Sequence, residues 1–425
     1  MPTLLMDILI VLLTVLSVFS LIYWSTVSGF IVSAHKQFPT ARDGIELAEH
    51  SPPTAHVCVV VPAHNEAGNI ATLIESLRAQ DYDRLRIVLA LDRCTDDTAG
   101  VARQAIDDDH RFEVIEIVQC PEDWAGKVHA AHQGFTQSKH AASSDMVLFT
   151  DADTWFDPSC VRAAVALAQD RGLDLLSLLS TLGTDSWFER VVQPYAGFEL
   201  ARQFPLTKVN RKYNDRQRAF ANGQFMLFRT KSYTAIGGHE GVKGAILEDL
   251  AFASETLDAK MQSGVLLADD MLRCRMYDSW EEFVRGWKRI YTESTNREIR
   301  RLRKYALRAP LTGFVYPVGS LVCVGAGIVW GDPSMQFINI GLGTLGFMAW
   351  LVTMVLVARA SHARVRDIWS SVIGAVLVGR IFQIALSDLR SGVQTQWGGK
   401  SYTRIAAEDE IAQTDADSKN QAGAA

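Results

Sequence analysis

The sequence has few cysteines and no excess of positive charge. Its 425 residues include six cysteines, with no C-x-x-C pair and no tight cluster among Cys58, Cys94, Cys120, Cys160, Cys274 and Cys323. This spacing argues against a disulfide framework or a zinc site and favours buried thiols in a reducing compartment. The formal net charge of −6 gives no general attraction to nucleic acid, so we expect no nucleic-acid partner.

Basic residues are also missing before the first long apolar segment, residues 8–24, so a cleaved secretory signal fits poorly. The segment is long enough to span a bilayer, and it ends in Tyr23 and Trp24, which favour the membrane interface. Residues 311–330 and 337–357 are two further apolar segments, joined by a linker without lysine or arginine. The sequence therefore predicts a multi-pass membrane protein.

Positive charges flank these segments on one side. They gather in residues 300–308 and 359–366 and in Lys36 and Arg42. The positive-inside rule then places the large central region in the cytoplasm, at the inner membrane if the source is bacterial. For residues 368–386 a spanning, a re-entrant and an interfacial placement stay open, because Arg380 lies within them. From about residue 406 the polar, acidic composition predicts disorder.

Strand and helix patterns alternate through the central region. Short apolar runs rich in β-branched residues predict strands, and apolar spacing of three and four residues predicts the helix at 68–79. The predicted strands are residues 56–62, 85–91, 113–118 and 146–150. Such alternation indicates an α/β fold with a doubly wound, mostly parallel sheet covered on both faces.

Carboxylates follow two of these strands. Asp151 and Asp153 come directly after strand 146–150, and Asp92 follows strand 85–91. Open α/β sheets bind ligands at this edge. Two carboxylates there suit a hard divalent cation, Mg²⁺ or Mn²⁺, that bridges the phosphates of a donor substrate. A solvated turn is the simpler explanation of the triplet taken alone.

Five short segments in one order resemble family 2 glycosyltransferases. They are residues 59–66 (Val-Val-Val-Pro-Ala-His-Asn-Glu), Asp92 with 95–98 (Thr-Asp-Asp-Thr), 125–127 (Ala-Gly-Lys), 151–153 (Asp-Ala-Asp) and 247–249 (Leu-Glu-Asp). The resemblance covers about residues 55–290. It implies a GT-A fold and inverting sugar transfer from a nucleotide-sugar.

A narrower resemblance concerns the acceptor. Residues 222–225, 237–239, 248–249 and 275–277 look like membrane enzymes that glycosylate lipids, such as ceramide, carotenoid or hopanoid-associated glycosyltransferases. This pattern does not fix which lipid receives the sugar.

The resemblance also implies residue roles. Asp249 matches the general base, and adjacent Glu248 raises its pKa or orients the acceptor. Asp153 is the expected metal ligand, while Asp151 contacts the ribose or the metal through water. Asp92 would bind the base. Lys127, in a Gly-Lys turn that opens a helix, and Glu66 complete the expected nucleotide-sugar site.

Residues 283–289 depart from the family's better-known Arg-Trp pattern. Arg285, Trp287 and Arg289 are candidates for diphosphate contacts and an aromatic acceptor platform. An amphipathic helix with its tryptophan at headgroup level is the alternative. Residues 285–308 hold many cations, so anionic lipid headgroups are expected partners. His239, in a glycine-permitted loop ten residues before Asp249, is a candidate on the acceptor side.

We therefore expect a membrane-anchored, metal-dependent inverting glycosyltransferase that moves one sugar, with a UDP-sugar as first choice of donor, to a membrane lipid hydroxyl. A processive polysaccharide synthase and a catalytically silent membrane scaffold are the alternatives. The oligomeric state stays open. The expected parts are an anchor (5–27), a GT-A domain (50–275), a basic interface segment (276–310), C-terminal membrane or interfacial helices (311–386) and a cytoplasmic tail (387–425).

Overall fold

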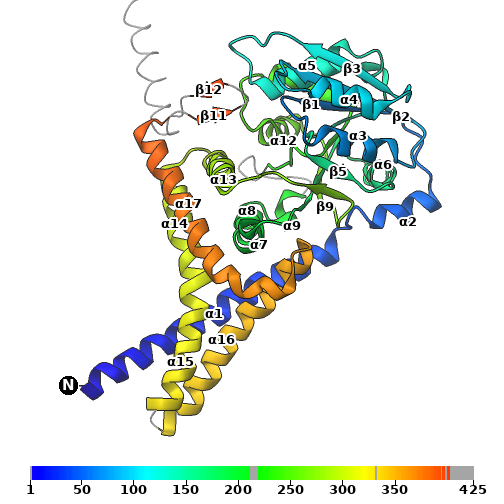
Figure 1. Ribbon diagram of the computed structural model, residues 1–425. Helices are drawn as coiled ribbons and strands as arrows, with labels where there is room; N and C mark the ends of the chain where they lie inside the picture. The colour runs from blue at the N-terminus through cyan, green and yellow to red at the C-terminus, as the bar shows by residue number, and fades with distance from the viewer. Residues whose placement is uncertain (1, 211–218, 331–332, 394, 398–399, 403–425) are drawn as a thin grey trace, which may run out of the picture.

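The computed structural model describes residues 2–210, 219–330, 333–393, 395–397 and 400–402 (Figure 1). It consists of an α/β domain joined to a group of long helices that extend away from it (Figure 1). The predicted disordered tail from residue 406 lies outside the described residues.

A seven-stranded sheet forms the centre of the α/β domain, in the order β3-β2-β1-β4-β8-β6-β9. Only β8 runs against its neighbours β4 and β6. The strands are β1 (Val57–Ala63), β2 (Leu85–Asp92), β3 (Phe112–Ile117), β4 (Met146–Phe149), β6 (Leu175–Leu179), β8 (Met226–Arg229) and β9 (Ser263–Leu267). This order confirms the predicted α/β class with a mostly parallel sheet, and with it the GT-A fold that the resemblance implies.

Helices cover both faces of the sheet, because every residue of β1 is buried and its side chains alternate between two cores. Val57, Val59 and Val61 pack with α3, α4 and α6, whereas Cys58 and Val60 pack with α5 and α12. The bounds are α3 (Ile70–Arg78), α4 (Thr98–Ile106), α5 (Gly126–Gln137), α6 (Cys160–Asp170) and α12 (Glu248–Asp258).

A smaller sheet, in the order β5-β10-β7, lies beside the carboxyl edge of β4. Its strands are β5 (Thr154–Phe156), β7 (Thr181–Leu182) and β10 (Leu272–Cys274). Strand β10 pairs antiparallel with β5, with Cys274 opposite Thr154. In this register Cys274 lies beside Thr154, the residue that follows Asp153.

Further helical elements complete the domain. They are α2 (Asp43–His50), η1 (Ala141–Ser143), α7 (Trp187–Val191), α8 (Gln193–Gln203), α9 (Leu206–Val209), α10 (Thr230–Ala235), α11 (Gly238–Gly241) and α13 (Trp280–Ser294). Two further strands, β11 (Thr395–Trp397) and β12 (Lys400–Tyr402), pair only with each other.

Four helical segments among the described residues are long and apolar enough to cross a membrane: Met6–Gln37, Ile299–Trp330, Met335–Ala360 and Val365–Ser391. They are built from α1 (Pro2–Gln37), the run α14 (Ile299–Pro310), η3 (Leu311–Val315) and α15 (Tyr316–Trp330), then α16 (Pro333–Ala360), and η4 (Val365–Ser370) with α17 (Ser371–Ser391). The three predicted spans are among these candidates. Their orientation stays a prediction.

Helix α17 runs back along α14 toward the α/β domain rather than beside α1 and α15 (Figure 1). The Phe382 ring stacks on Tyr291 of α13 at 3.8 Å between centroids. On α13, Trp287 is buried between Phe283 and Tyr291. Trp287 is therefore an interior residue, and its alternative placement at the headgroup surface is wrong.

Candidate functional site

The carboxyl ends of β1, β2 and β4 open onto a cavity of about 1870 Å³. The lining includes every residue predicted to bind donor, to hold metal or to act as base: Glu66, Asp92, Lys127, Asp151, Asp153, Glu248, Asp249, Arg285, Trp287 and Arg289. These residues come from six separate elements or the loops that follow them: β1, β2, α5, β4, α12 and α13. The structure thus brings the whole predicted set together.

Lys127 forms ion pairs with carboxylates on two different elements. It is the second residue of α5, and its Nζ lies 2.7 Å from Oδ1 of Asp151 and 2.5 Å from Oε1 of Glu248. Although burial alone would lower the pKa of Lys127, these two carboxylates raise it above its usual range. Lys127 is therefore a fixed cation between the end of β4 and the start of α12.

Asp249 is held by two backbone N–H groups. Gly223 donates to Oδ2 at 3.0 Å and Leu250 donates to Oδ1 at 2.8 Å. Burial, together with the charge of Glu248, raises the pKa of Asp249 to about 6, against the opposing effect of Lys127. A carboxylate whose pKa lies this close to neutral is suited to accept a proton from a hydroxyl.

Asp153 has the features expected of a metal ligand. Burial, and then the charges of Asp151 and Glu66, raise its pKa to about 7. Its buried Oδ1 accepts no hydrogen bond from the described residues. The Cys274 thiol hydrogen-bonds its carboxylate. An acidic oxygen without a donor fits a divalent cation, so the donor set here suits Mg²⁺ or Mn²⁺.

No three of the described His, Cys, Asp and Glu side chains are grouped as a ready-made metal site. A cation at Asp153 would therefore need further ligands from Asp151, water or the phosphates of a substrate. This is the arrangement expected of magnesium-type sites, which use one or two carboxylates plus substrate phosphates.

Asp92 and Glu66, which were also predicted to bind the nucleotide-sugar, lie at the end of β2 and in the loop after β1. Asp92 is buried and forms a two-point pair with Arg93, at 2.9 and 2.6 Å. Its backbone oxygen lies 2.6 Å from Nδ1 of His64. Glu66 accepts from Asn69 at 2.9 Å, and burial raises its pKa.

Helix α13 supplies the remaining cations. Arg289 is buried deeply enough for desolvation to lower the pKa of its guanidinium, although Glu248, Asp249 and Asp151 oppose that shift. Arg285 is exposed on the same lining. These two arginines face an otherwise acidic site, as anion-binding groups would.

His239 does not lie where the sequence analysis expected it. The sequence suggested an acceptor-side role, but the side chain is buried in the core and does not line the cavity. Its Nδ1 lies 2.8 Å from the Tyr233 hydroxyl, and its ring packs on Phe149 and Phe252. The glycine at position 237, with φ of 84°, turns this segment inward.

Sequence reasoning missed two residues in contact with the site. Gly223 touches the base directly, and Cys274 supports Asp153 while accepting a hydrogen bond from Nε2 of Gln224 at 3.0 Å. Gly223 lies within residues 222–225, which are part of the resemblance to lipid-glycosylating enzymes, but the resemblance gave it no role. No sequence signal marked Cys274, because its position depends on the register of β10 with β5.

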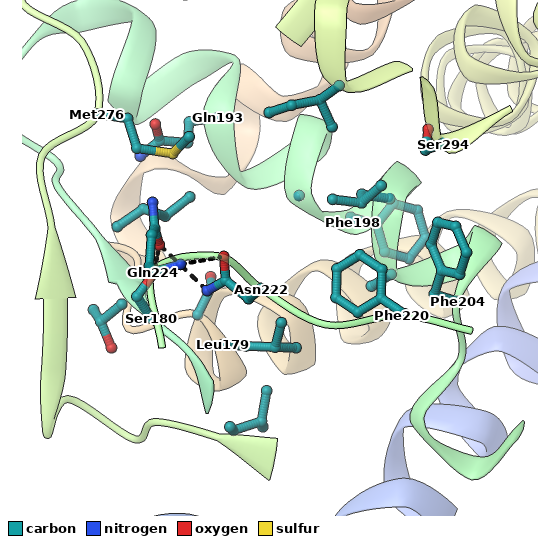
Figure 2. Close-up of a pocket in the computed structure, with 18 of the residues that line it drawn as sticks. Leu179, Ser180, Gln193, Phe198, Phe204, Phe220, Asn222, Gln224, Met276 and Ser294 are labelled. Atoms are coloured by element: carbon teal, nitrogen blue, oxygen red, sulfur yellow. Dashed lines mark hydrogen bonds between the residues drawn. The ribbon is translucent and has the colours of Figure 1, made fainter. Parts of the chain in front are cut away.

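Amide and aromatic side chains occupy different parts of the cavity (Figure 2). Ser180, Asn222 and Gln224 form a hydrogen-bonded group that positions the loop around Gly223. Phe198, Phe204 and Phe220 lie together on the other side of this view (Figure 2). Beyond them the lining continues onto α1 and α16, through residues such as Tyr23, Val27 and Val357.

Comparison with known proteins points to one family. Residues 58–237 match the family model described as Glycosyl transferase family 2. The chain is 27% identical over 121 residues to EpsH of Bacillus subtilis (strain 168), provisionally named a glycosyltransferase, across 28% of this chain and 31% of that protein. It is 21% identical over 273 residues to the 4,4'-diaponeurosporenoate glycosyltransferase of Staphylococcus haemolyticus (strain JCSC1435), across 62% and 67% of the two chains.

Among solved structures, the mannosyltransferase PcManGT from Pyrobaculum calidifontis, in complex with GDP-Man and Mn²⁺, shares 14% identity with a TM-score of 0.46. That match covers 90% of this chain and 98% of the other. By contrast, the chain spans about a third of EpsH. The segment that carries Glu66, Asp92, Lys127, Asp151 and Asp153 thus has the sequence signature of Glycosyl transferase family 2.

Proposed function

We propose that this protein is a membrane-bound glycosyltransferase that moves one sugar, with inversion, from a nucleotide-sugar to the hydroxyl of a membrane lipid. One observation carries the proposal. A single cavity joins the carboxylate site at the sheet edge to the apolar faces of α1 and α16, two candidate membrane spans. A polar donor and an apolar acceptor can both reach this cavity.

The charges at the sheet end of the cavity favour a nucleotide-sugar there. A nucleoside diphosphate leaving group gains negative charge as the glycosidic bond breaks, and a divalent cation at Asp153 and Asp151 would offset that charge. Lys127 and Arg289 supply fixed positive charge around the same point. Asp92 and Glu66 lie at adjacent strand ends, where we place the nucleoside. A UDP-sugar remains the first donor to test.

Asp249 is the base that would activate the acceptor. The lipid hydroxyl gives its proton to Asp249 as its oxygen attacks the anomeric carbon. The carbon–oxygen bond to the diphosphate breaks, and the nucleoside diphosphate leaves with the electron pair. Glu248 contacts Lys127 at 2.5 Å, and its charge beside Asp249 helps to raise the pKa of that base.

The lipid acceptor has additional support from the name of one relative. The Staphylococcus haemolyticus enzyme is named for a diaponeurosporenoate acceptor. An apolar acceptor of that kind would suit the aromatic and aliphatic lining between Phe220 and Tyr23. Because the membrane helices have basic flanks, we expect this domain to face the cytoplasm, where nucleotide-sugars are made, and to contact anionic headgroups.

A screen of donors against lipid acceptors tests the proposal. Detergent-purified protein is incubated with each nucleotide-sugar, Mg²⁺ or Mn²⁺ and a lipid extract, and the lipids are read by mass spectrometry. We expect a mass gain of one sugar on one lipid class. A polymer ladder would indicate a processive synthase instead, and donor binding without any product from any lipid would contradict the proposal.

A further inference from the structure

We propose that the membrane-facing part of the cavity binds an acidic group, a phosphate or a carboxylate, of the acceptor lipid through Arg202 and Arg308. This inference rests on the proposed function and specifies its substrate. The acceptor would be an anionic lipid whose reactive hydroxyl lies farther from the apolar chains than its acidic group does.

The two arginines share one buried carboxylate. Glu199 on α8 is fully buried. Its Oε1 accepts from Arg202 at 2.8 Å, and its Oε2 accepts from Arg308 at 2.5 Å. Two guanidinium groups around one carboxylate leave a net positive charge beside an apolar cavity. A charge in such surroundings favours an anionic partner, because water is too scarce to screen it.

Aromatic rings hold both guanidinium groups in place. Arg202 lies 5.0 Å from the ring centroid of Tyr23 and 5.4 Å from that of Phe198, and Arg308 lies 4.4 Å from that of Tyr305. Both arginines line the cavity. The buried Nε of Arg308 has no hydrogen-bond acceptor among the described residues. A guanidinium has five N–H donors, so several remain for a phosphate or carboxylate.

Charge is separated along the cavity. Among the described residues that α1, α8, α9, α14 and α16 contribute to the lining, the charged ones are basic, and none is Asp or Glu: His35, Lys36, Arg202, Lys208, Arg308 and Arg359. The carboxylates Asp151, Asp153 and Asp249 lie at the sheet end. The cations at the membrane end therefore attract an acidic group of the acceptor.

Aromatic rings line the cavity near the arginines. Phe204 and Phe220 pack at 4.8 Å between centroids. They lie next to Phe198, with Asn222 on the other side of the view (Figure 2). Because Arg202 lies over Phe198 and Gly223 follows Asn222, we place the acidic group and the reacting hydroxyl at different ends of the cavity. A lipid headgroup whose acidic group and hydroxyl are some distance apart could contact the arginines and the base at the same time.

Native mass spectrometry on the full chain tests the anion site without requiring turnover. Purified protein is mixed with equal amounts of dioleoylphosphatidylglycerol, oleate and dioleoylglycerol, which offer a phosphate, a carboxylate and no acid. The test variant is Arg202→Gln, which leaves Glu199 paired with Arg308. The control is Arg380→Gln, an exposed arginine of α17 that does not line the cavity.

We expect the native chain and Arg380→Gln to retain one of the acidic lipids at least about tenfold over dioleoylglycerol, the scale of a charge-assisted hydrogen-bond pair. Arg202→Gln should lose this preference, and the acid retained identifies the group. Equal retention of all three lipids, or an unchanged preference in Arg202→Gln, would overturn the proposal.

Transfer assays separate the two claims. With a productive donor, phosphatidylglycerol should be glycosylated faster than dioleoylglycerol, because both carry hydroxyls but only one carries an acid. Equal rates in the native protein would overturn the acidic acceptor while the glycosyltransferase proposal stands. An Arg202-dependent lipid preference without transfer to any lipid from any donor would instead contradict the proposed function.

Discussion

The backbone N–H of Gly223 lies 3.0 Å from Oδ2 of Asp249 and donates a hydrogen bond to it. A Cβ atom at position 223 would stand 3.2 Å from Nζ of Lys127 and 3.4 Å from that same carboxylate oxygen. The missing side chain thus lets the loop, the cation and the base meet. Any larger residue at position 223 would require the ends of the Lys127 and Asp249 side chains to shift by a few tenths of an ångström.

Replacing Gly223 with alanine should lower kcat with little change in thermal stability. The new methyl group crowds Lys127 and Asp249, which must shift by a few tenths of an ångström, and a shift of this kind costs up to about tenfold in rate. Gly244→Ala is the matched control, since a Cβ there meets open space. Comparison of kcat and Tm for both variants checks the prediction. If Gly223→Ala has the same kcat as the native protein, close packing at position 223 does not contribute to catalysis.

The rate should depend on pH through Asp249. Because its pKa is raised to about 6, the base is protonated below that pH. We therefore expect kcat to fall about tenfold per pH unit below pH 6 and to level off above it. A pH profile of the single-turnover rate checks this. A rate that stays constant down to pH 4 would rule out Asp249 as the titrating base.

Stability should show the opposite trend for the same group. The pKa of Asp249 is higher in the folded state than its usual 3.8, so the folded state binds the proton more tightly. This contribution is fully present below pH 3.8 and is lost as pH rises through about 6. Asp249→Asn should therefore gain Tm relative to native protein at pH 7.5, and much less at pH 4.5.

Lys127→Met should destabilise the protein and abolish transfer. It leaves the carboxylates of Asp151 and Glu248 without their shared cation. Because the site faces the cavity, we expect a loss of about 1–3 kcal/mol rather than the larger value of a fully buried pair. Lys243→Met is the control, since its pair with Asp123 is exposed and should contribute less than about 1 kcal/mol. Equal losses of unfolding free energy in the two variants would show that Lys127 stabilises the site no more than an exposed ion pair does.

The edge of the sheet could be predicted from sequence, because local patterns determine it. Runs of buried β-branched residues define β1, β2 and β4, and Asp92, Asp151 and Asp153 follow from where those runs end. The start of α12 places Glu248 and Asp249 in its first turn, as expected from the preference of acids for that position.

Long-range packing determines the rest. His239 looked accessible in a glycine-containing loop, but contacts with Tyr233 and Phe149 place it in the core. Trp287 is buried because α13 packs against α17, which lies far along the chain. Arg202 and Arg308, which are far apart in the sequence, both pair with Glu199. No local pattern reports such pairings.

Cys274→Ala should weaken metal binding more than it weakens the fold. Its thiol keeps its proton, because burial holds the pKa of Cys274 well above its usual range, and it hydrogen-bonds Asp153. Loss of such a supporting donor typically lowers metal affinity by about tenfold or more. Mn²⁺ titration followed by electron paramagnetic resonance checks this directly. Cys274→Ser keeps a donor and should bind Mn²⁺ nearly as the native protein does; equal weakening in both variants would contradict the support role.

The most direct test compares native protein with Asp249→Asn in single-turnover transfer to the acceptor lipid, with nucleotide binding measured in parallel. The asparagine keeps the shape but cannot take the proton. We predict that Asp249→Asn binds UDP and Mn²⁺ as the native protein does, yet transfers sugar about 10²–10⁴-fold more slowly. Transfer at the native rate by Asp249→Asn would contradict base catalysis by this residue and the mechanism built on it.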